Sequence, residues 1–137
     1  MTVSPYLQQP IMRWLYALTW TALVILLLLQ SSSEPVIGPA SPPGIPSTPR
    51  EALLTFGHFV AFFVMTFLLW WALATTTSYL RALLIALVIA LFLGTITEIL
   101  QSFVPSREAS LFDLAMNWSS TLCVAGMIHT QRTISAK

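Results

Sequence analysis

The residues most suited to chemistry flank a short polar stretch in the C-terminal half of the chain. Glu98 and Gln101 are spaced i,i+3, and Asp113 and Asn117 are spaced i,i+4, so each pair would share one face of a helix. Arg107 lies between the two pairs and could reach either carboxylate. Because a carboxylate that faces lipid is costly, we expect both faces to point into a helix bundle.

Three kinds of chemistry could use these residues together with His58. An imidazole and two carboxylates could bind a divalent metal, although their spacing matches no specific metal motif. The same groups could act as acid and base, but no serine nearby has the setting of a nucleophile. Arg107 flanked by amides could bind a phosphate or carboxylate, which needs the fewest assumptions. We therefore predict no metal and no cofactor.

Each of these residues also has a structural explanation. Ser110 and Asp113 have the spacing of a capping box at the start of a helix. Arg107 and Glu98 could pair to fix the turn between two helices, and Asn117 could join helices by hydrogen bonds. Glu98 is the hardest to explain structurally, because carboxylates inside membrane spans are usually functional.

The composition indicates a membrane protein. Of the 137 residues, 56% are hydrophobic and 8% are charged, against roughly 25% charged in soluble domains. The net charge of +1 leaves no basic patch for a nucleic-acid backbone, which excludes that class of partner. The single cysteine, Cys123, lies in an apolar run and is expected to be buried as a small apolar side chain.

Four apolar segments predict an all-α, polytopic membrane bundle with four transmembrane helices. Residues 14–29 are short for a span of about 20 residues, but residues 11 and 12 can extend the segment. A signal peptide is the alternative for this segment, and a retained helix is favoured because no A-x-A site follows. The remaining spans are predicted at 53–74, 82–100 and 111–129.

These spans divide the chain into four parts. Residues 1–30 form the N-terminal transmembrane helix, and residues 31–52 form a Pro-rich linker that must avoid lipid. Residues 53–129 form a three-helix unit, and residues 130–137 form a short tail. Four spans place both termini on one side of the membrane. The distribution of basic residues favours the cytoplasm for the termini, so the linker would be extracytoplasmic.

Depth along the helices brings the polar residues to one level. His58 lies about 7.5 Å from the outer end of the second span, and Glu98 lies about 4.5 Å from the exit of the third. Asp113 and Asn117 lie roughly 4.5 and 10 Å into the fourth. The predicted polar site therefore lies in one leaflet, on the outward side, and consists of His58, Glu98, Gln101, Arg107, Asp113 and Asn117, with Ser110 as a helix cap.

These residues resemble the VanZ-like family of small bacterial membrane proteins over about residues 53–127. The resemblance rests on the pattern E-x-x-Q, then a turn with P-x-R, then S-x-x-D-x-x-x-N, which stands here as Glu98, Gln101, Pro105, Arg107, Ser110, Asp113 and Asn117. His58, early in the preceding span, is a further landmark. Thr55-Phe56-Gly57 stands where the family commonly has a lysine, and Phe62 where it often has a tyrosine.

The resemblance implies a multi-pass protein of the bacterial cell membrane. The family's namesake is associated with low-level teicoplanin resistance, so we expect a non-enzymatic envelope protein with an outward polar site. Arg107 and Gln101 would contact an anionic lipid headgroup, a cell-wall precursor or a glycopeptide. The alternatives are a membrane enzyme that acts on lipid-linked or phosphorylated substrates, with Glu98 or Asp113 as base, and a structural subunit.

Overall fold

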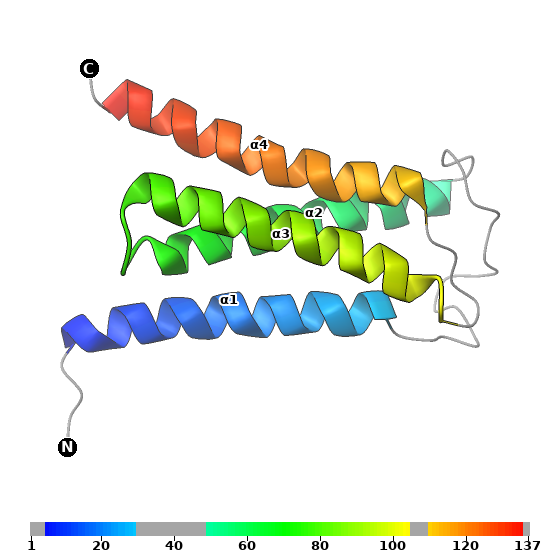
Figure 1. The fold of residues 1–137 in the computed structure, drawn as a ribbon, viewed down its shortest axis with the longest axis horizontal. Helices are drawn as coiled ribbons and strands as arrows, with labels where there is room; N and C mark the ends of the chain where they lie inside the picture. The colour runs from blue at the N-terminus through cyan, green and yellow to red at the C-terminus, as the bar shows by residue number, and fades with distance from the viewer. Residues whose placement is uncertain (1–4, 30–48, 105–109, 136–137) are drawn as a thin grey trace.

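The chain forms four long α-helices that run alternately in opposite directions, as a computed structural model shows (Figure 1). The structure describes residues 5–29, 49–104 and 110–135, without the side chains of 5–8, 49–51, 54 and 135. The helices are α1 (Pro5–Leu29), α2 (Pro49–Leu73), α3 (Tyr79–Gln101) and α4 (Leu111–Ser135). Each helix is long and apolar enough to cross a bilayer. The predicted all-α, four-helix membrane fold is thus confirmed.

Four helix boundaries extend by three residues or more beyond the apolar segments that predicted them. The first three helices begin earlier, at Pro5, Pro49 and Tyr79, and α4 continues past residue 129 to Ser135. Proline is well tolerated in the first turn of a helix, where its missing N–H would have no intrahelical partner. Hydropathy marks the part of a helix that lies in lipid, whereas backbone hydrogen bonds allow the helix to continue into a polar sequence.

The two ends of the bundle differ, and we name them by their content. At the network end, α1 and α3 finish and α2 and α4 begin; at the arginine end, α1 begins, α4 finishes and a turn joins α2 to α3 (Figure 1). Hydroxyls cap this turn: Thr75 donates to the carbonyl of Ala72 at 2.7 Å, and Thr76 and Thr77 donate to that of Leu73 at 3.2 Å. These bonds satisfy carbonyls that the end of α2 leaves without intrahelical donors.

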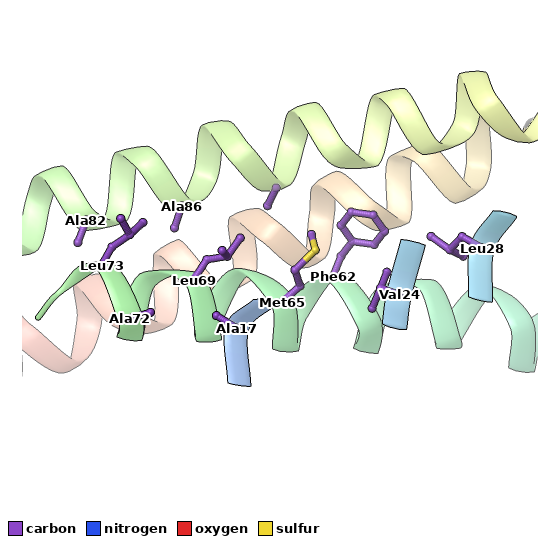
Figure 2. Close-up of a cluster of buried hydrophobic side chains, with 11 residues drawn as sticks. Ala17, Val24, Leu28, Phe62, Met65, Leu69, Ala72, Leu73, Ala82 and Ala86 are labelled. Carbon is purple, nitrogen blue, oxygen red and sulfur yellow. The ribbon is translucent and has the colours of Figure 1, made fainter. Parts of the chain in front are cut away.

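The main apolar core lies where α1, α2 and α3 meet, and it extends from Leu73 and Ala82 at the arginine end to Leu28 near the network end (Figure 2). Three alanines of α3 at i,i+4 spacing, Ala82, Ala86 and Ala90, are at most 1% exposed and let the neighbouring helices approach closely. Opposite them lie Met65 and Leu69 of α2. A second cluster joins Leu83 of α3 to Val124 and Ile128 of α4.

The outer helices, α1 and α4, contact α2 and α3 but not each other within the described residues. Because α4 packs only through the face that carries Val124 and Ile128, its opposite face is exposed. Cys123 lies on the exposed side, so the expectation that it is buried is wrong. The apolar run around it predicted contact with other side chains, whereas in a membrane protein such a run is also compatible with contact to lipid.

Candidate functional site

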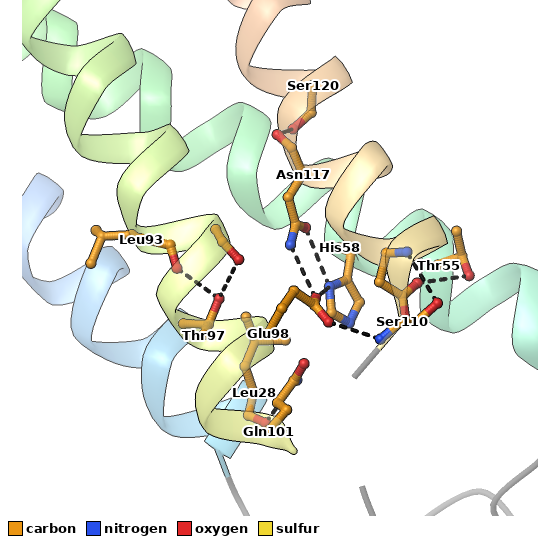
Figure 3. A network of polar contacts seen from close by, with 12 residues as sticks. Leu28, Thr55, His58, Leu93, Thr97, Glu98, Gln101, Ser110, Asn117 and Ser120 are labelled. Carbon is orange, nitrogen blue, oxygen red and sulfur yellow. Dashed lines mark hydrogen bonds and ion pairs between the residues drawn. The ribbon is translucent and has the colours of Figure 1, made fainter. Parts of the chain in front are cut away.

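A hydrogen-bonded network joins α2, α3 and α4 near the network end (Figure 3). At its centre are His58 of α2, Glu98 of α3 and Asn117 of α4, which are 9%, 5% and 0% exposed. The amide nitrogen of Asn117 donates to Oε1 of Glu98 at 3.3 Å. The amide oxygen of Asn117 lies 3.3 Å from Nδ1 of His58. One asparagine therefore links an imidazole and a carboxylate from two other helices.

The geometry determines which nitrogen of His58 carries hydrogen. An amide oxygen can only accept, so Nδ1 of His58 must be the donor to Asn117. The same Nδ1 lies 3.8 Å from Oε1 of Glu98, close enough for an ion pair whenever the imidazole is protonated. The order of donors thus runs from His58 to Asn117 to Glu98, and Glu98 is the acceptor on which the network ends.

Glu98 also binds the start of α4. Its Oε2 accepts the backbone N–H of Ser110 at 3.2 Å. Glu98 lies in the last turn of α3, where the helix dipole disfavours a negative charge, but α4 begins beside it. The N-terminal dipole of α4 and this N–H compensate for the unfavourable position.

The start of α4 has only half of the capping box that the sequence indicates. Oγ of Ser110 accepts the backbone N–H of Asp113 at 3.3 Å, as an N-cap does. The reciprocal bond goes to Glu98 from α3, because the carboxylate of Asp113 instead accepts a hydrogen bond from Thr55 of α2 at 3.3 Å. Asp113 is half-buried, so it connects the network to the surface.

A column of hydroxyls continues the network towards the middle of the bundle. The carbonyl of Asn117 accepts from Ser120 at 2.8 Å and from Thr121 at 2.9 Å. Thr121 in turn lies 3.3 Å from the hydroxyl of Thr66 on α2, which donates to the carbonyl of Phe62 at 2.7 Å. All these hydroxyls are buried. Because each hydroxyl carries a single hydrogen, Thr66 and Thr121 bond to each other only when one of them releases its backbone carbonyl, and this contact is the one that joins α2 to α4.

Gly94 makes the close approach of the three helices possible. A Cβ at this position would lie 3.3 Å from Cβ of Asn117 and 3.3 Å from Cε1 of Phe62. Any larger residue would push α4 or α2 away from α3. The glycine one turn before Glu98 therefore brings Asn117 within reach of the carboxylate.

One predicted site residue, Gln101, lies apart from this network. Gln101 is 3% exposed, and its amide nitrogen donates to the carbonyl of Leu28 at 3.0 Å. Gln101 thus caps the end of α1 and ties that helix to α3, a contact that implies a role in holding the bundle. Arg107, the other predicted ligand contact, lies outside the described residues.

The network contains polar residues that the sequence interpretation missed, namely Thr55, Thr66, Ser120 and Thr121. Helical spacing was the available signal. Thr55 is one turn before His58, and Thr121 is one turn after Asn117, so each shares a face with a residue already identified. Threonines in membrane spans usually bond to their own helix backbone, which is why they did not stand out.

The chemical capacity of the site follows from its groups. No cluster of three metal-binding side chains occurs among the residues that the structure describes. The described groups are one buried carboxylate, one imidazole, one amide and the half-buried carboxylate of Asp113. Such a set can hold helices in register and accept hydrogen bonds at its rim.

Comparison of this chain with protein-family models, with curated proteins and with solved structures finds no match. The geometry of the network is thus the basis for assigning a function. The chain is a multi-pass membrane protein by its four apolar helices.

Proposed function

We propose that this chain is a VanZ-like, non-enzymatic protein of the bacterial cell envelope that contributes to glycopeptide tolerance. In this proposal the network end faces the outside of the cell membrane, and both termini are cytoplasmic. The network fixes the junction of α2, α3 and α4, and the rim around Asp113 engages an envelope component.

One observation carries the proposal. The residues that resemble the VanZ-like pattern come from three helices, and His58, Glu98, Ser110 and Asn117 meet in contacts to a single carboxylate. Asp113 adjoins this group through Ser110. Five residues of the pattern, spread over some sixty positions of sequence, thus form one physical unit, as a family-defining site would.

The exposed chemistry narrows the ligand. Of the two residues expected to contact it, Gln101 is engaged with α1, and the described rim presents the half-buried carboxylate of Asp113, which accepts a hydrogen bond from the buried hydroxyl of Thr55. A carboxylate accepts hydrogen bonds from amines and hydroxyls and repels phosphates. We therefore favour a glycopeptide, or the amine-bearing part of a cell-wall precursor, over an anionic lipid headgroup as the ligand at this end.

Expression in a glycopeptide-susceptible host tests the proposal. We expect the wild-type chain to raise the teicoplanin concentration that inhibits growth. Asp113→Asn should abolish this effect while the amount of protein in the membrane is unchanged. Ser102→Ala is the matched control, because Ser102 is exposed at the same end and its hydroxyl, among the described residues, donates to the carbonyl of Ile99 in the preceding turn. The proposal fails if the wild-type chain gives no tolerance, or if both variants lose it equally.

The burial of the network favours a structural subunit as the second candidate. His58, Glu98 and Asn117 are at most 9% exposed and bond to one another. On this interpretation Asp113→Asn leaves the phenotype unchanged, and Glu98→Ala lowers the amount of protein in the membrane. Quantitative immunoblots of the membrane fraction, measured beside the growth assay, separate the two candidates.

A further inference from the structure

The arginine end of the bundle carries basic residues without acidic ones. Arg13, Arg81 and Arg132 lie there, in the first half of α1, the first turn of α3 and the last turn of α4. None of the five acidic residues of the chain lies near these arginines in the sequence. Glu34 falls between α1 and α2, and Glu51 falls in the first turn of α2. Glu98 is in the last turn of α3, Glu108 falls between α3 and α4, and Asp113 is in the first turn of α4. The arginine end is thus a cationic surface with no carboxylate from its own helices to neutralise it.

Two of these arginines stack on aromatic rings. The guanidinium carbon of Arg13 lies 4.6 Å from the ring centroid of Trp71, and Nη1 of Arg13 donates to the Trp71 carbonyl at 3.4 Å. Tyr16 also stacks with Trp71, with the ring centroids 6.5 Å apart. The guanidinium of Arg13 is therefore held at one position on the junction of α1 and α2.

The second arginine is held in the same way on the other side of the bundle. The guanidinium carbon of Arg132 lies 4.5 Å from the ring centroid of Tyr79. The Tyr79 hydroxyl donates to the carbonyl of Ile128 at 2.8 Å, which fixes the ring against α4. Trp70 meets the Tyr79 ring edge-on at 6.1 Å, and Trp70 adjoins Trp71 in sequence. The aromatic–arginine belt thus crosses all four helices and consists of Arg13, Tyr16, Trp70, Trp71, Tyr79 and Arg132.

We propose that this belt binds the phosphate of an anionic phospholipid in the leaflet that it faces. An aromatic ring occupies the flat face of a guanidinium, so the N–H groups at its edge remain available to bind phosphate oxygens in the same plane. Tryptophan and tyrosine place this part of the protein at the level of lipid headgroups. Arg132 is exposed and forms no hydrogen bond or ion pair with the described residues, so charge complementarity specifies an anionic headgroup.

The purified full-length chain in nanodiscs provides the test. The nanodiscs contain phosphatidylcholine with added phosphatidylglycerol. Native mass spectrometry counts the molecules of each lipid that stay bound to the folded protein, so the two lipids compete directly. We expect a preference for phosphatidylglycerol that declines with salt and falls about fivefold for each of Arg13→Gln and Arg132→Gln. Arg81→Gln is the matched control, because it removes the same charge at the same end from an arginine with no ring partner among the described residues.

Each outcome is decisive. A preference that is lost in the two belt variants and retained in Arg81→Gln supports the belt. An equal loss in Arg81→Gln shows diffuse attraction to the membrane surface and overturns it, as does the absence of any preference in the wild-type chain. Because Arg13→Gln could loosen α1, Arg13→Lys is measured beside it. Lysine retains the charge without the planar fork, so the belt proposal requires a partial loss of preference in a folded protein.

Discussion

The two halves of the α2–α3–α4 interface are held together by different forces. Towards the arginine end the helices meet through Leu83, Val124 and Ile128, with the alanines of α3 packed against α2 and α1. Towards the network end they meet through His58, Glu98 and Asn117. In lipid the apolar half obtains little from burial itself, because lipid tails are as apolar as leucine, and so depends on close packing. The network half instead depends on a small number of directed bonds, and each of them is vulnerable to a single substitution.

Removal of the Glu98 carboxylate should destabilise the network half of the interface more than any other single substitution. Glu98→Ala leaves the N–H of Ser110, the amide of Asn117 and the imidazole of His58 without their shared acceptor. We expect the free energy of unfolding to fall by about 3 kcal/mol. Reversible unfolding of the purified protein in mixed micelles measures the change. Ile99→Ala, at an exposed position beside it, is the control and should cost little; similar losses in both variants would contradict a special role for the carboxylate.

In the apolar half the largest effect should come from a cavity. Met65 is 1% exposed and packs among α1, α2 and α3, so Met65→Ala should lower the free energy of unfolding by about 2 kcal/mol. Leu84→Ala removes a side chain that is 52% exposed to the lipid side and should be close to neutral in the same assay. If Leu84→Ala proved as costly as Met65→Ala, packing would not be what holds this half.

A methyl group added at Gly94, where α2, α3 and α4 meet, tests how far the network half depends on close helix packing. Gly94→Ala places a Cβ 3.3 Å from Cβ of Asn117, which is fixed to the backbone of α4 and can move only with that helix. We expect a loss of about 1 kcal/mol and weaker bonding of Asn117 to Glu98. Gly126→Ala is the matched control, since nothing lies within 4 Å of the added Cβ, and it should stabilise α4 slightly. Stabilisation by both substitutions would show that α3 and α4 can separate freely.

The smallest loss of stability is expected at Thr66, where the hydroxyl column that continues the network ends. Thr66→Val keeps the shape of the side chain and removes the hydroxyl that donates to Phe62 and lies 3.3 Å from that of Thr121. Hydrogen bonds between membrane helices contribute about 0.6 kcal/mol on average, so we expect a loss of that size in the unfolding assay. A loss as large as that of Glu98→Ala would show that Thr66 contributes as much as the carboxylate and would erase the boundary between the two halves.

Much of the fold follows from hydropathy. Four apolar segments predict four helices, because only helices and closed barrels satisfy the backbone in lipid. The depth of Glu98, Asp113 and Asn117 along their segments predicts that these residues share one level. The helix ends were less predictable, because residues 130–135 continue α4 although they are polar. Hydropathy reports the surroundings of a helix rather than its length.

The partners within the site were not predictable to the same degree. Spacing placed Gln101 on the face of Glu98, but whether its amide meets a ligand or the end of α1 depends on where α1 docks. The capping box likewise predicted a bond between Asp113 and the N–H of Ser110, which Glu98 takes over from another helix. In both cases a group from a distant segment competes with a local partner, and local sequence carries no information about that competition.

The sequence by itself determined that this chain is a four-helix membrane protein and that its buried polar groups gather at one end, because lipid tolerates neither an unpaired backbone nor a scattered charge. Only the tertiary structure decided which groups pair. Gly94 brings α4 against α3, Asn117 then bridges His58 and Glu98, and Thr55 draws Asp113 away from its own helix start. These pairings depend on interhelical distances of a few ångströms, which follow from packing and not from composition or spacing.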